Sequence, residues 1–337
     1  MTERSVICRL PLDSHGAPSR SYRRAHEVFA RRQAAGHAAC ARQQAGIRIQ
    51  GDSRMASAAA KVAIVTGASG MRGIGRAVAL RFARDGLDIA LVDIHRPAAA
   101  MPQTEIDAGW NGIDSVRAEI EALGRRAISI HADVSDPQQV ADICARTVRE
   151  LGSFDVLVNS ARAGLGRDRA PVVELELPEW DRVMSINARG SLMLAQAAAR
   201  HFVARGIAGR IILMSSLAGK RGMPLHAAYT MSKFAVNGLV QVLASELGQY
   251  GITVNAICPG VVDTGRFNLS EKLEAERLGI SAEERNRAVM HEYAKRNALR
   301  RVASSDDVAG MAAFLISPDG VHVTGQAINV DGGECFH

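Results

Sequence analysis

Two residues four positions apart, Tyr229 and Lys233 in the stretch "AAYTMSKFAV", are of types that can exchange a proton. The stretch is mostly apolar and reads as a helix, in which positions i and i+4 share one face about 5 to 6 Å apart. An ammonium at that distance, at an effective dielectric of about 20, stabilises a phenolate by roughly 3 kcal/mol and so lowers the pKa of the phenol. Tyr229 is therefore a candidate acid and base near neutral pH. Such a pair alone is more often an amphipathic surface pair, so the assignment depends on its companions.

A glycine-rich segment, "VTGASGMRGIGRA", is the second candidate for chemistry, because glycines let a backbone approach a pyrophosphate closely. Its glycines lie between an apolar run and a helical pattern, at Gly67, Gly70, Gly73 and Gly75. The helix that follows would supply free N–H groups and the positive end of its dipole. Asp93 follows at the end of the next apolar run, where a carboxylate can accept both adenosine ribose hydroxyls. A plain strand-to-helix turn, with Asp93 as a cap, is the alternative.

The elements that must position these residues alternate from Lys61 onward. Short, apolar, β-branched runs are "KVAIVTG", "DIALVDI", "RAISIHADV", "FDVLVNS", "GRIILMSS", "ITVNAICPG" and "GQAINVDGG". Helical segments separate them, including those at 115–123, 137–151, 178–205, 226–249 and 305–316. Apolar strands alternating with helices predict a doubly wound, Rossmann-type α/β domain with a mostly parallel seven-stranded sheet and helices on both faces. Two long connections, 95–112 and 261–301, are typical of functional lids.

Composition limits the function classes. The chain has 337 residues, is 47% hydrophobic, and contains no apolar run near the roughly 18 residues that a membrane span needs. Its five cysteines show no CxxC or metal-ligand spacing, which favours a reduced, cytoplasmic compartment and no metal. Residues 1–54 hold ten arginines against four acidic residues and so account for the whole net charge of +6. The patterned region is neutral, which argues against a nucleic-acid reader.

We divide the chain into an Arg/Ala-rich extension at 1–58 and one dinucleotide-binding domain at 59–337. The extension has no sustained apolar face, so we expect it to be disordered or loosely helical. It is a tail without function, an organelle-targeting segment, or translated sequence upstream of a start at Met55. We favour the last, because the folded pattern begins six residues after Met55.

Over residues 60 to 333 the chain resembles the short-chain dehydrogenase/reductase family. The resemblance rests on the "TG…GIG" turn, "ADV" at 132–134, "VLVNSA" at 156–161, Asn187 in "SINARG", "SS" at 215–216, "YTMSK" at 229–233, "CPGVVDT" at 258–264 and "GQAINVDGG". Members of the family place a serine thirteen residues before the tyrosine, which selects Ser216 over Ser215. The resemblance implies that Ser216 binds the substrate oxygen, Tyr229 exchanges the proton, Lys233 holds the nicotinamide ribose, and Asn187 positions a water linked to Lys233.

The same resemblance implies a set of cofactor contacts: Gly67, Ser69, Arg72, Gly73, Ile74, Gly75, Asp93, Asp133, Val134, Asn159, Tyr229, Lys233, Val262 and Thr264. This sequence departs from the family pattern at two places that bear on these contacts. The turn has five residues between Gly67 and Gly73 where three are usual, which puts contacts of Ser69 and Arg72 in question. Residues 159–162 read "NSAR" where "NNAG" is usual, which places Arg162 beside the cofactor.

Around the active-site end, five loop cations form a basic rim: Arg162, Arg167, Arg169, Lys220 and Arg221. Such a rim could attract a carboxylate, a phosphate or a thioester carrier. Our preferred interpretation is solvated loop charge, partly offset by Asp168. Apolar positions in the 261–301 connection, Phe267, Leu269 and Leu273, suit an apolar alcohol or ketone equally well.

The sequence thus predicts an NAD(P)-dependent oxidoreductase that interconverts a secondary alcohol and a ketone. The alternatives are an NADPH-linked 3-oxoacyl thioester reductase and, from another class, a dinucleotide-binding sensor or scaffold without turnover. Asp93 favours NAD over NADP, whereas Arg72 could reward the 2′-phosphate of NADP. The resemblance implies a homotetramer, or else a homodimer, formed through the helices at 178–205 and 226–249.

Overall fold

A computed structural model of the chain describes residues 61–97, 101–264 and 269–337. The leader at 1–58, its Met55 hypothesis and Phe267 lie outside the described residues, and the side chains of Leu269 and Leu273 are not described. The elements, in chain order, are β1 Val62–Thr66, α2 Ile74–Arg84, β2 Asp88–Asp93, α3 Gln103–Asp107, α4 Ile113–Ala122, β3 Ala127–His131, α5 Pro137–Leu151, β4 Val156–Asn159, η2 Val172–Glu174, α6 Leu177–Met184, η3 Ser185–Arg189, α7 Gly190–Arg205, β5 Arg210–Met214, η4 Leu217–Gly219, α8 Ala227–Leu247, η5 Gly248–Tyr250, β6 Thr253–Pro259, α9 Leu269–Leu278, α10 Ala282–Ala294, α11 Ser305–Ile316, η6 Pro318–Gly320 and β7 Ala327–Val330.

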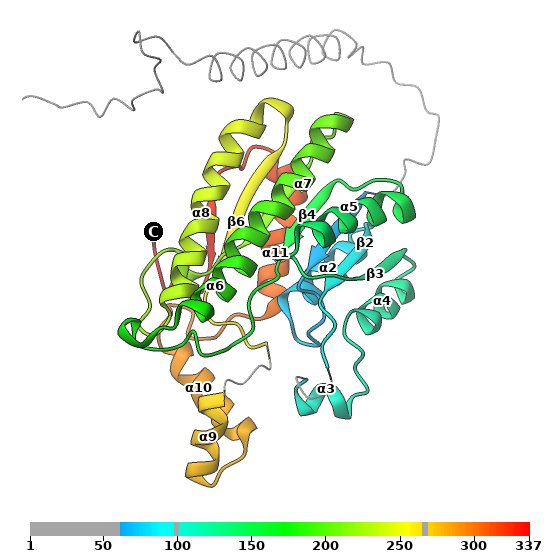
Figure 1. Cartoon of the computed structure of the whole chain (residues 1–337). Helices are drawn as coiled ribbons and strands as arrows, with labels where there is room; N and C mark the ends of the chain where they lie inside the picture. Colours follow the sequence, from blue (N-terminus) through cyan, green and yellow to red (C-terminus); the bar gives the residue numbers. More distant parts are fainter. Residues whose placement is uncertain (1–60, 98–100, 265–268) are drawn as a thin grey trace, which may run out of the picture. The chain divides into compact units, whose positions relative to one another are not determined.

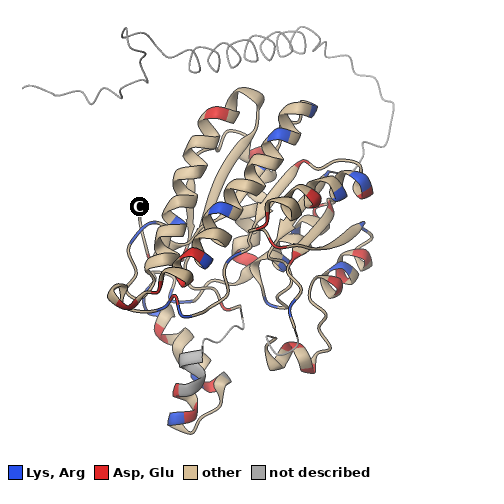
Figure 2. Cartoon of the chain, in the orientation of Figure 1, with Lys and Arg blue, Asp and Glu red and all other residues tan. Residues whose placement is uncertain are grey.

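The predicted seven-stranded sheet is confirmed. Its strands run in the order β3-β2-β1-β4-β5-β6-β7, and every neighbouring pair is parallel. Charged Asp, Lys or Arg residues occur only at strand ends, at Asp88, Asp93 and Arg210 (Figure 2). Strands without charge along their length are what a sheet covered on both faces requires, because either side of each strand is removed from water.

Helices cover the two faces of the sheet in separate sets (Figure 1). On one face, α5, α7 and α8 pack their apolar residues against the strands, with Phe154 and Phe202 fully buried among them. On the other face, α2, α4 and α11 pack in the same way around Phe82. The chain is therefore doubly wound, as the alternating pattern predicted.

The strand order reverses between β1 and β4, which sit side by side although β2 and β3 separate them in sequence. Thr66 and Asn159 are paired at the carboxyl ends of these two strands. Directly beyond them Gly67 has φ +69°, and a Cβ there would lie 2.6 Å from the carbonyl of Ser160. The two strand ends can approach this closely only because Gly67 has no side chain. In open α/β sheets a crevice at this point is where ligands bind.

The long helix predicted over 178–205 is confirmed, and it contains one π-helical turn that the sequence pattern did not reveal. The segment forms α6 and α7 with one π-helical turn, η3, between them. Asn187 lies in this turn with its side chain bonded to two other segments, and a Cβ on Gly190 would lie 3.0 Å from the carbonyl of Val134. The extra residue of a π turn realigns such groups, and π turns are frequent at functional sites.

The two long connections also contain helices that the sequence pattern did not reveal. The first holds the short helix α3, and the second holds α9 and α10. The helix α10 begins with a capping box, in which Ser281 and Glu284 each satisfy the other's backbone N–H. Among the residues that the structure describes, none of the helices is long and apolar enough to cross a membrane.

Candidate active site

Tyr229 and Lys233 lie on one face of α8 and both line a cleft at the carboxyl end of the sheet. The Lys233 side chain is buried, its Nζ lies 5.5 Å from the centre of the Tyr229 ring, and it donates a hydrogen bond to the Met214 carbonyl at 2.7 Å. Burial raises the pKa of Tyr229, but the charges of Lys233 and Arg162 and a hydrogen bond with Ser216 outweigh it. The pKa of the phenol is thus held below its ordinary value.

The pKa of Lys233 is lowered as well. Burial lowers the pKa of Lys233, attraction to Tyr229 opposes this, and repulsion from Arg162 adds to it. Because the ammonium sits within a buried helix face rather than in water, its charge reaches the phenol with little screening. The pair has the electrostatics of a proton-exchange site.

Ser215 and Ser216 differ in what they bond. The buried Ser215 donates from Oγ to the Lys233 carbonyl at 3.2 Å, which ties β5 to α8. Ser216 is partly exposed in the cleft and caps η4 by accepting from the Ala218 N–H at 3.1 Å, and its hydroxyl contributes to the lowered pKa of the Tyr229 phenol. Ser216 is thus the serine whose hydroxyl shares the space of the phenol, in agreement with the thirteen-residue spacing.

A chain of buried hydrogen bonds links the sheet to α8 through Asn187. Thr66 Oγ1 donates to Asn159 Oδ1 at 2.6 Å, and Asn159 Nδ2 donates to Ser191 Oγ at 2.9 Å. Ser191 Oγ donates to the Asn187 carbonyl at 2.5 Å, and Asn187 Nδ2 donates to Ser232 Oγ at 3.0 Å. Each side chain in this series of hydrogen bonds has partners, so the series holds β1, β4, η3 and α8 in fixed register.

The structure brings most of the sequence-predicted site residues into one cleft. Those on its wall are Gly67, Gly73, Ile74, Asp93, Asp133, Val134, Ser216, Tyr229, Lys233, Val262 and Thr264. Five others do not line it: Ser69, Gly75, Asn159 and Asn187 are buried, and the Arg72 side chain is 54% exposed. The cleft has a volume of about 390 Å³, within the range of small-molecule sites.

The glycine turn fits a dinucleotide in two respects. The turn lies at the start of α2, whose first N–H groups face the cleft end of the sheet, so it presents the kind of site that binds phosphates. The Ser69 hydroxyl is buried and has no hydrogen-bond partner in the described structure. A buried polar atom without a partner is costly, and a bound polar group would remove that cost.

At the adenosine side, Asp93 and Arg72 are both engaged by the protein. Asp93 accepts from the Ser69 N–H and the Ile94 N–H, each at 2.8 Å, one on each carboxylate oxygen. Arg72 donates to Asp263 at 2.5 Å, and its carbonyl accepts from Ser305. The carboxylate of Asp93 still faces the cleft, whereas the guanidinium of Arg72 points to the base of the 261–301 connection.

The first long connection braces the lengthened turn. Glu105 is buried, accepts from the Met71 N–H at 2.8 Å and pairs with Arg96 at 2.9 Å. Trp110 Nε1 and Arg96 both donate to the Ser69 carbonyl, at 2.7 and 3.0 Å. The extra residues of the turn are therefore held by contacts with Arg96, Glu105 and Trp110.

Sequence reasoning missed several residues of the substrate side. Met223, His226 and Tyr293 line the cleft beside Tyr229. His226 precedes Tyr229 by three positions on the same helix, and its ring lies edge-on to the phenol at 6.5 Å, so helical spacing could have found it. Tyr293 comes from α10, and no local pattern in the sequence connects that helix with the site.

Comparison with known proteins agrees with this geometry. Residues 67–334 match the family model described as enoyl-(acyl carrier protein) reductase. A short-chain dehydrogenase/reductase of Armillaria gallica is 39% identical over 82% of this chain and 96% of its own. The L-2,3-butanediol dehydrogenase of Corynebacterium glutamicum is 37% identical over 82% of this chain and 99% of its own. The crystal structure of an acetoin dehydrogenase from Enterobacter cloacae superposes with a TM-score of 0.64 at 30% identity, covering 81% of this chain and 95% of that one.

A fold of this topology, a site of this composition and relatives of this similarity define one class. The chain belongs to the short-chain dehydrogenase/reductase family, whose members are oxidoreductases that use nicotinamide dinucleotides.

Proposed function

We propose that the protein interconverts a secondary alcohol and a ketone, using NAD(H) or NADP(H). The observation that carries the proposal is that Ser216, Tyr229 and Lys233 line one cleft, with the Lys233 ammonium 5.5 Å from the centre of the Tyr229 ring. Two similar proteins are a butanediol dehydrogenase and an acetoin dehydrogenase, which supports secondary alcohols and ketones as the substrate class.

In the direction of oxidation, Tyr229 Oη accepts the hydroxyl proton of the alcohol while Ser216 Oγ hydrogen-bonds the same oxygen. A bound nicotinamide dinucleotide supplies the acceptor for the hydride that leaves the carbinol carbon, so the alcohol becomes a ketone. Lys233 keeps the phenol ready to ionise and has N–H groups beyond the Met214 bond for a ribose hydroxyl. In the reverse direction Tyr229 returns the proton to the ketone oxygen.

Asn187 acts in this scheme as a positioning residue. Its amide already bonds the Ala163 N–H and Ser232, which supports a role in fixing the loop after β4 against α8. The water that the family resemblance places between Asn187 and Lys233 remains a prediction.

For the cofactor we propose NAD, on the basis of Asp93. Its carboxylate faces the cleft with acceptor capacity left on both oxygens, which suits ribose hydroxyls and repels a 2′-phosphate. The competing argument from Arg72 is weaker, because that guanidinium is paired with Asp263. Arg96, the next cation, is paired with Glu105.

We also propose assembly into a homotetramer or homodimer through α7 and α8. Both helices expose large apolar side chains, among them Leu192 and Val203 on α7 and Met231, Phe234 and Val242 on α8. Size-exclusion chromatography with light scattering tests this, and a monomer at micromolar concentration would contradict it. A cytoplasmic location stays a proposal as well, supported by the unpaired thiols of Cys144, Cys258 and Cys335.

A panel of secondary alcohols and ketones, followed by nicotinamide absorbance with each dinucleotide, tests the main proposal. We expect turnover of at least one pair and a loss of that turnover in Tyr229→Phe. Tight dinucleotide binding with no turnover across the panel would favour a sensor or scaffold instead.

A further inference from the structure

The five cations of the basic rim are of two kinds. Arg167 is exposed and pairs with Glu176 at 2.9 Å, and Arg221 pairs with Glu334. Lys220 does not belong to the cleft wall. Arg162 and Arg169 do line the cleft, on the same wall as Tyr229, and neither forms an ion pair with any acidic side chain of the described residues.

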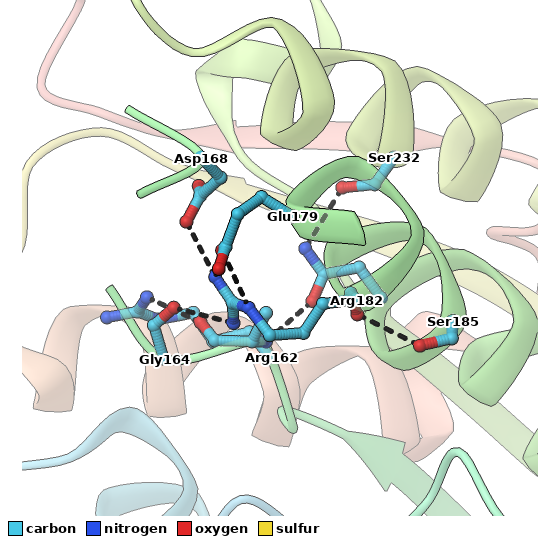
Figure 3. Close-up of polar contacts among 9 residues, drawn as sticks. Arg162, Gly164, Asp168, Glu179, Arg182, Ser185 and Ser232 are labelled. Carbon is cyan, nitrogen blue, oxygen red and sulfur yellow. Dashed lines mark hydrogen bonds and ion pairs between the residues drawn. The ribbon is translucent and has the colours of Figure 1, made fainter. Parts of the chain in front are cut away.

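Asp168, the acidic residue that we expected to offset the basic rim, pairs with a residue outside the rim. The buried carboxylate of Asp168 pairs with Arg182 at 2.7 Å, and Arg182 also pairs with Glu179 at 2.9 Å (Figure 3). Some of the Asp168 charge reaches Arg169. Even so, burial and repulsion from Arg162 outweigh that attraction and lower the pKa of Arg169. Arg169 is exposed and is attracted by Asp168, as the interpretation of solvated, partly offset charge expects. Arg162 is only half-buried in the cleft wall, and it forms no ion pair among the described residues.

Hydrogen bonds tie the loop that carries the two arginines to neighbouring elements, and Figure 3 draws those around Arg162 and Arg182. Arg182 Nη1 donates to the Gly164 carbonyl at 3.2 Å, and the Ala163 N–H donates to Asn187 Oδ1 at 2.8 Å. Arg162 Nη1 donates to the Ala163 carbonyl at 3.1 Å. These bonds tie the loop to α6 and η3 and hold the Arg162 guanidinium against the loop backbone, so the loop and Arg162 are positioned before any substrate arrives. A site arranged in advance loses less free energy on binding.

Two guanidinium groups that line a cleft and form no ion pair among the described residues are available to bind an anionic ligand. A guanidinium binds a carboxylate through two parallel N–H donors. Arg162, Arg169 and Tyr229 line the same cleft, so an anionic group bound by the two arginines would share that cleft with the reacting carbon. A carboxylate attached directly, or through one methylene, is short enough, whereas a phosphate ester or a thioester carrier places its charge further away.

We propose that Arg162 and Arg169 bind the carboxylate of the substrate, and that the enzyme acts on short hydroxy and oxo carboxylic acids. This rests on the proposed alcohol–ketone function and narrows it. The other interpretation is that the two arginines only favour the phenolate of Tyr229, in which case neutral and acidic substrates would depend on them equally.

Matched substrates separate these interpretations. The probes are 3-hydroxybutyrate, its neutral methyl ester, 2-hydroxypropyl phosphate and 3-oxobutanoyl coenzyme A. The three alcohols are assayed with the oxidised dinucleotide, and the ketone is assayed with the reduced one. We expect the unmutated enzyme to prefer the acid over the ester by at least about tenfold in kcat/KM. In Arg162→Gln and in Arg169→Gln the ratio of acid to ester should fall about tenfold, mainly through KM. Arg167→Gln, in the same loop but paired with Glu176, is the control and should keep the ratio.

An unchanged ratio in both variants would overturn the carboxylate site while leaving the alcohol–ketone function intact. Preference for the phosphate ester or the thioester over the acid would overturn it too.

Calorimetric binding of butyrate, which has no carbinol group, in the presence of NAD keeps the two proposals apart. Binding that weakens about tenfold in Arg162→Gln and Arg169→Gln, but not in Arg167→Gln, would support the site even if no probe were turned over. In that event the proposed function, not the carboxylate site, would be wrong. Absence of butyrate binding by the unmutated protein would count against the site.

Discussion

The two halves of the cleft differ in how their charges are balanced. At the adenosine half, the charged side chains have partners within the protein: Asp93 has two backbone N–H groups, Arg72 has Asp263, and Arg96 has Glu105. At the catalytic half, Lys233, Arg162 and Arg169 gather around Tyr229, and no acidic side chain of the described residues forms an ion pair with them.

The two halves of the cleft therefore have different roles: the adenosine half maintains the shape of the site, and the catalytic half carries out the chemistry. Balanced charges at the adenosine half fix a lengthened turn and leave only the carboxylate of Asp93 to discriminate between dinucleotides. Unbalanced positive charge at the catalytic half is available to stabilise whatever becomes negative there, first the phenolate and then, on our proposal, a substrate carboxylate. Substitutions in the catalytic half should therefore change turnover strongly, and those in the adenosine half should change cofactor choice or very little.

The largest effect is expected from Tyr229→Phe. Loss of the hydroxyl removes the proton acceptor, so kcat should fall by about 10²- to 10⁴-fold while the dissociation constant of the dinucleotide changes only a few-fold. Steady-state kinetics and a fluorescence titration measure the two quantities. Retention of most of the unmutated rate would show that Tyr229 is not the acid–base group.

Lys233→Ala should lower both turnover and dinucleotide affinity, because one ammonium serves the phenol and the ribose. We expect a loss of about 10²-fold or more in kcat, from a less acidic Tyr229, together with a weaker dinucleotide. Lys220→Ala, a lysine outside the cleft wall, is the control for removal of positive charge. If dinucleotide affinity does not change, the proposed ribose contact is wrong.

Asp93→Asn addresses the adenosine half without removing its acceptor. The amide oxygen can still accept from one backbone N–H, but the charge that repels a 2′-phosphate is gone. We expect the unmutated enzyme to favour NAD over NADP by at least about tenfold in kcat/KM, and the variant to narrow that gap mainly by better use of NADP. Equal use of both dinucleotides before mutation would contradict the role of Asp93.

The smallest effect is expected from Arg72→Ala. Its ion pair with Asp263 is largely exposed, and such pairs contribute about 0 to 1 kcal/mol. NADP kinetics should therefore stay within about fivefold of the unmutated values. A selective loss of NADP turnover well beyond that factor would show that Arg72 leaves Asp263 to bind the 2′-phosphate.

The sequence was informative where a local pattern determines the structure. Apolar runs predicted all seven strands, because strands buried on both faces can hold few polar residues. Helical spacing placed Tyr229 and Lys233 on one face, and the thirteen-residue spacing selected Ser216 over Ser215. The strands and the Tyr229–Lys233 pair were inferred from short stretches whose geometry is fixed by their own secondary structure, whereas the choice of Ser216 came from the family resemblance.

The sequence was uninformative where the ion-pair partner of a side chain lies on another element of the fold. Arg72 was weighed as a phosphate ligand, but its partner Asp263 lies 191 residues away. Asp168, in the loop after β4, was assigned to the rim, but Arg182 on α6 pairs with it. Side-chain pairing of this kind depends on the packing of whole elements, and no spacing rule encodes it.

Direct titration of the Tyr229 phenol tests the central claim, that Lys233 and its neighbouring cations keep this side chain ready to ionise. Phenolate absorbance is recorded against pH for the unmutated protein and for Tyr229→Phe, and the difference between the two curves belongs to Tyr229 alone. We predict that this difference rises with a midpoint clearly below pH 10.0, the ordinary value for tyrosine, and moves upward in Lys233→Ala. A midpoint at or above pH 10.0, unmoved by Lys233→Ala, would contradict the account.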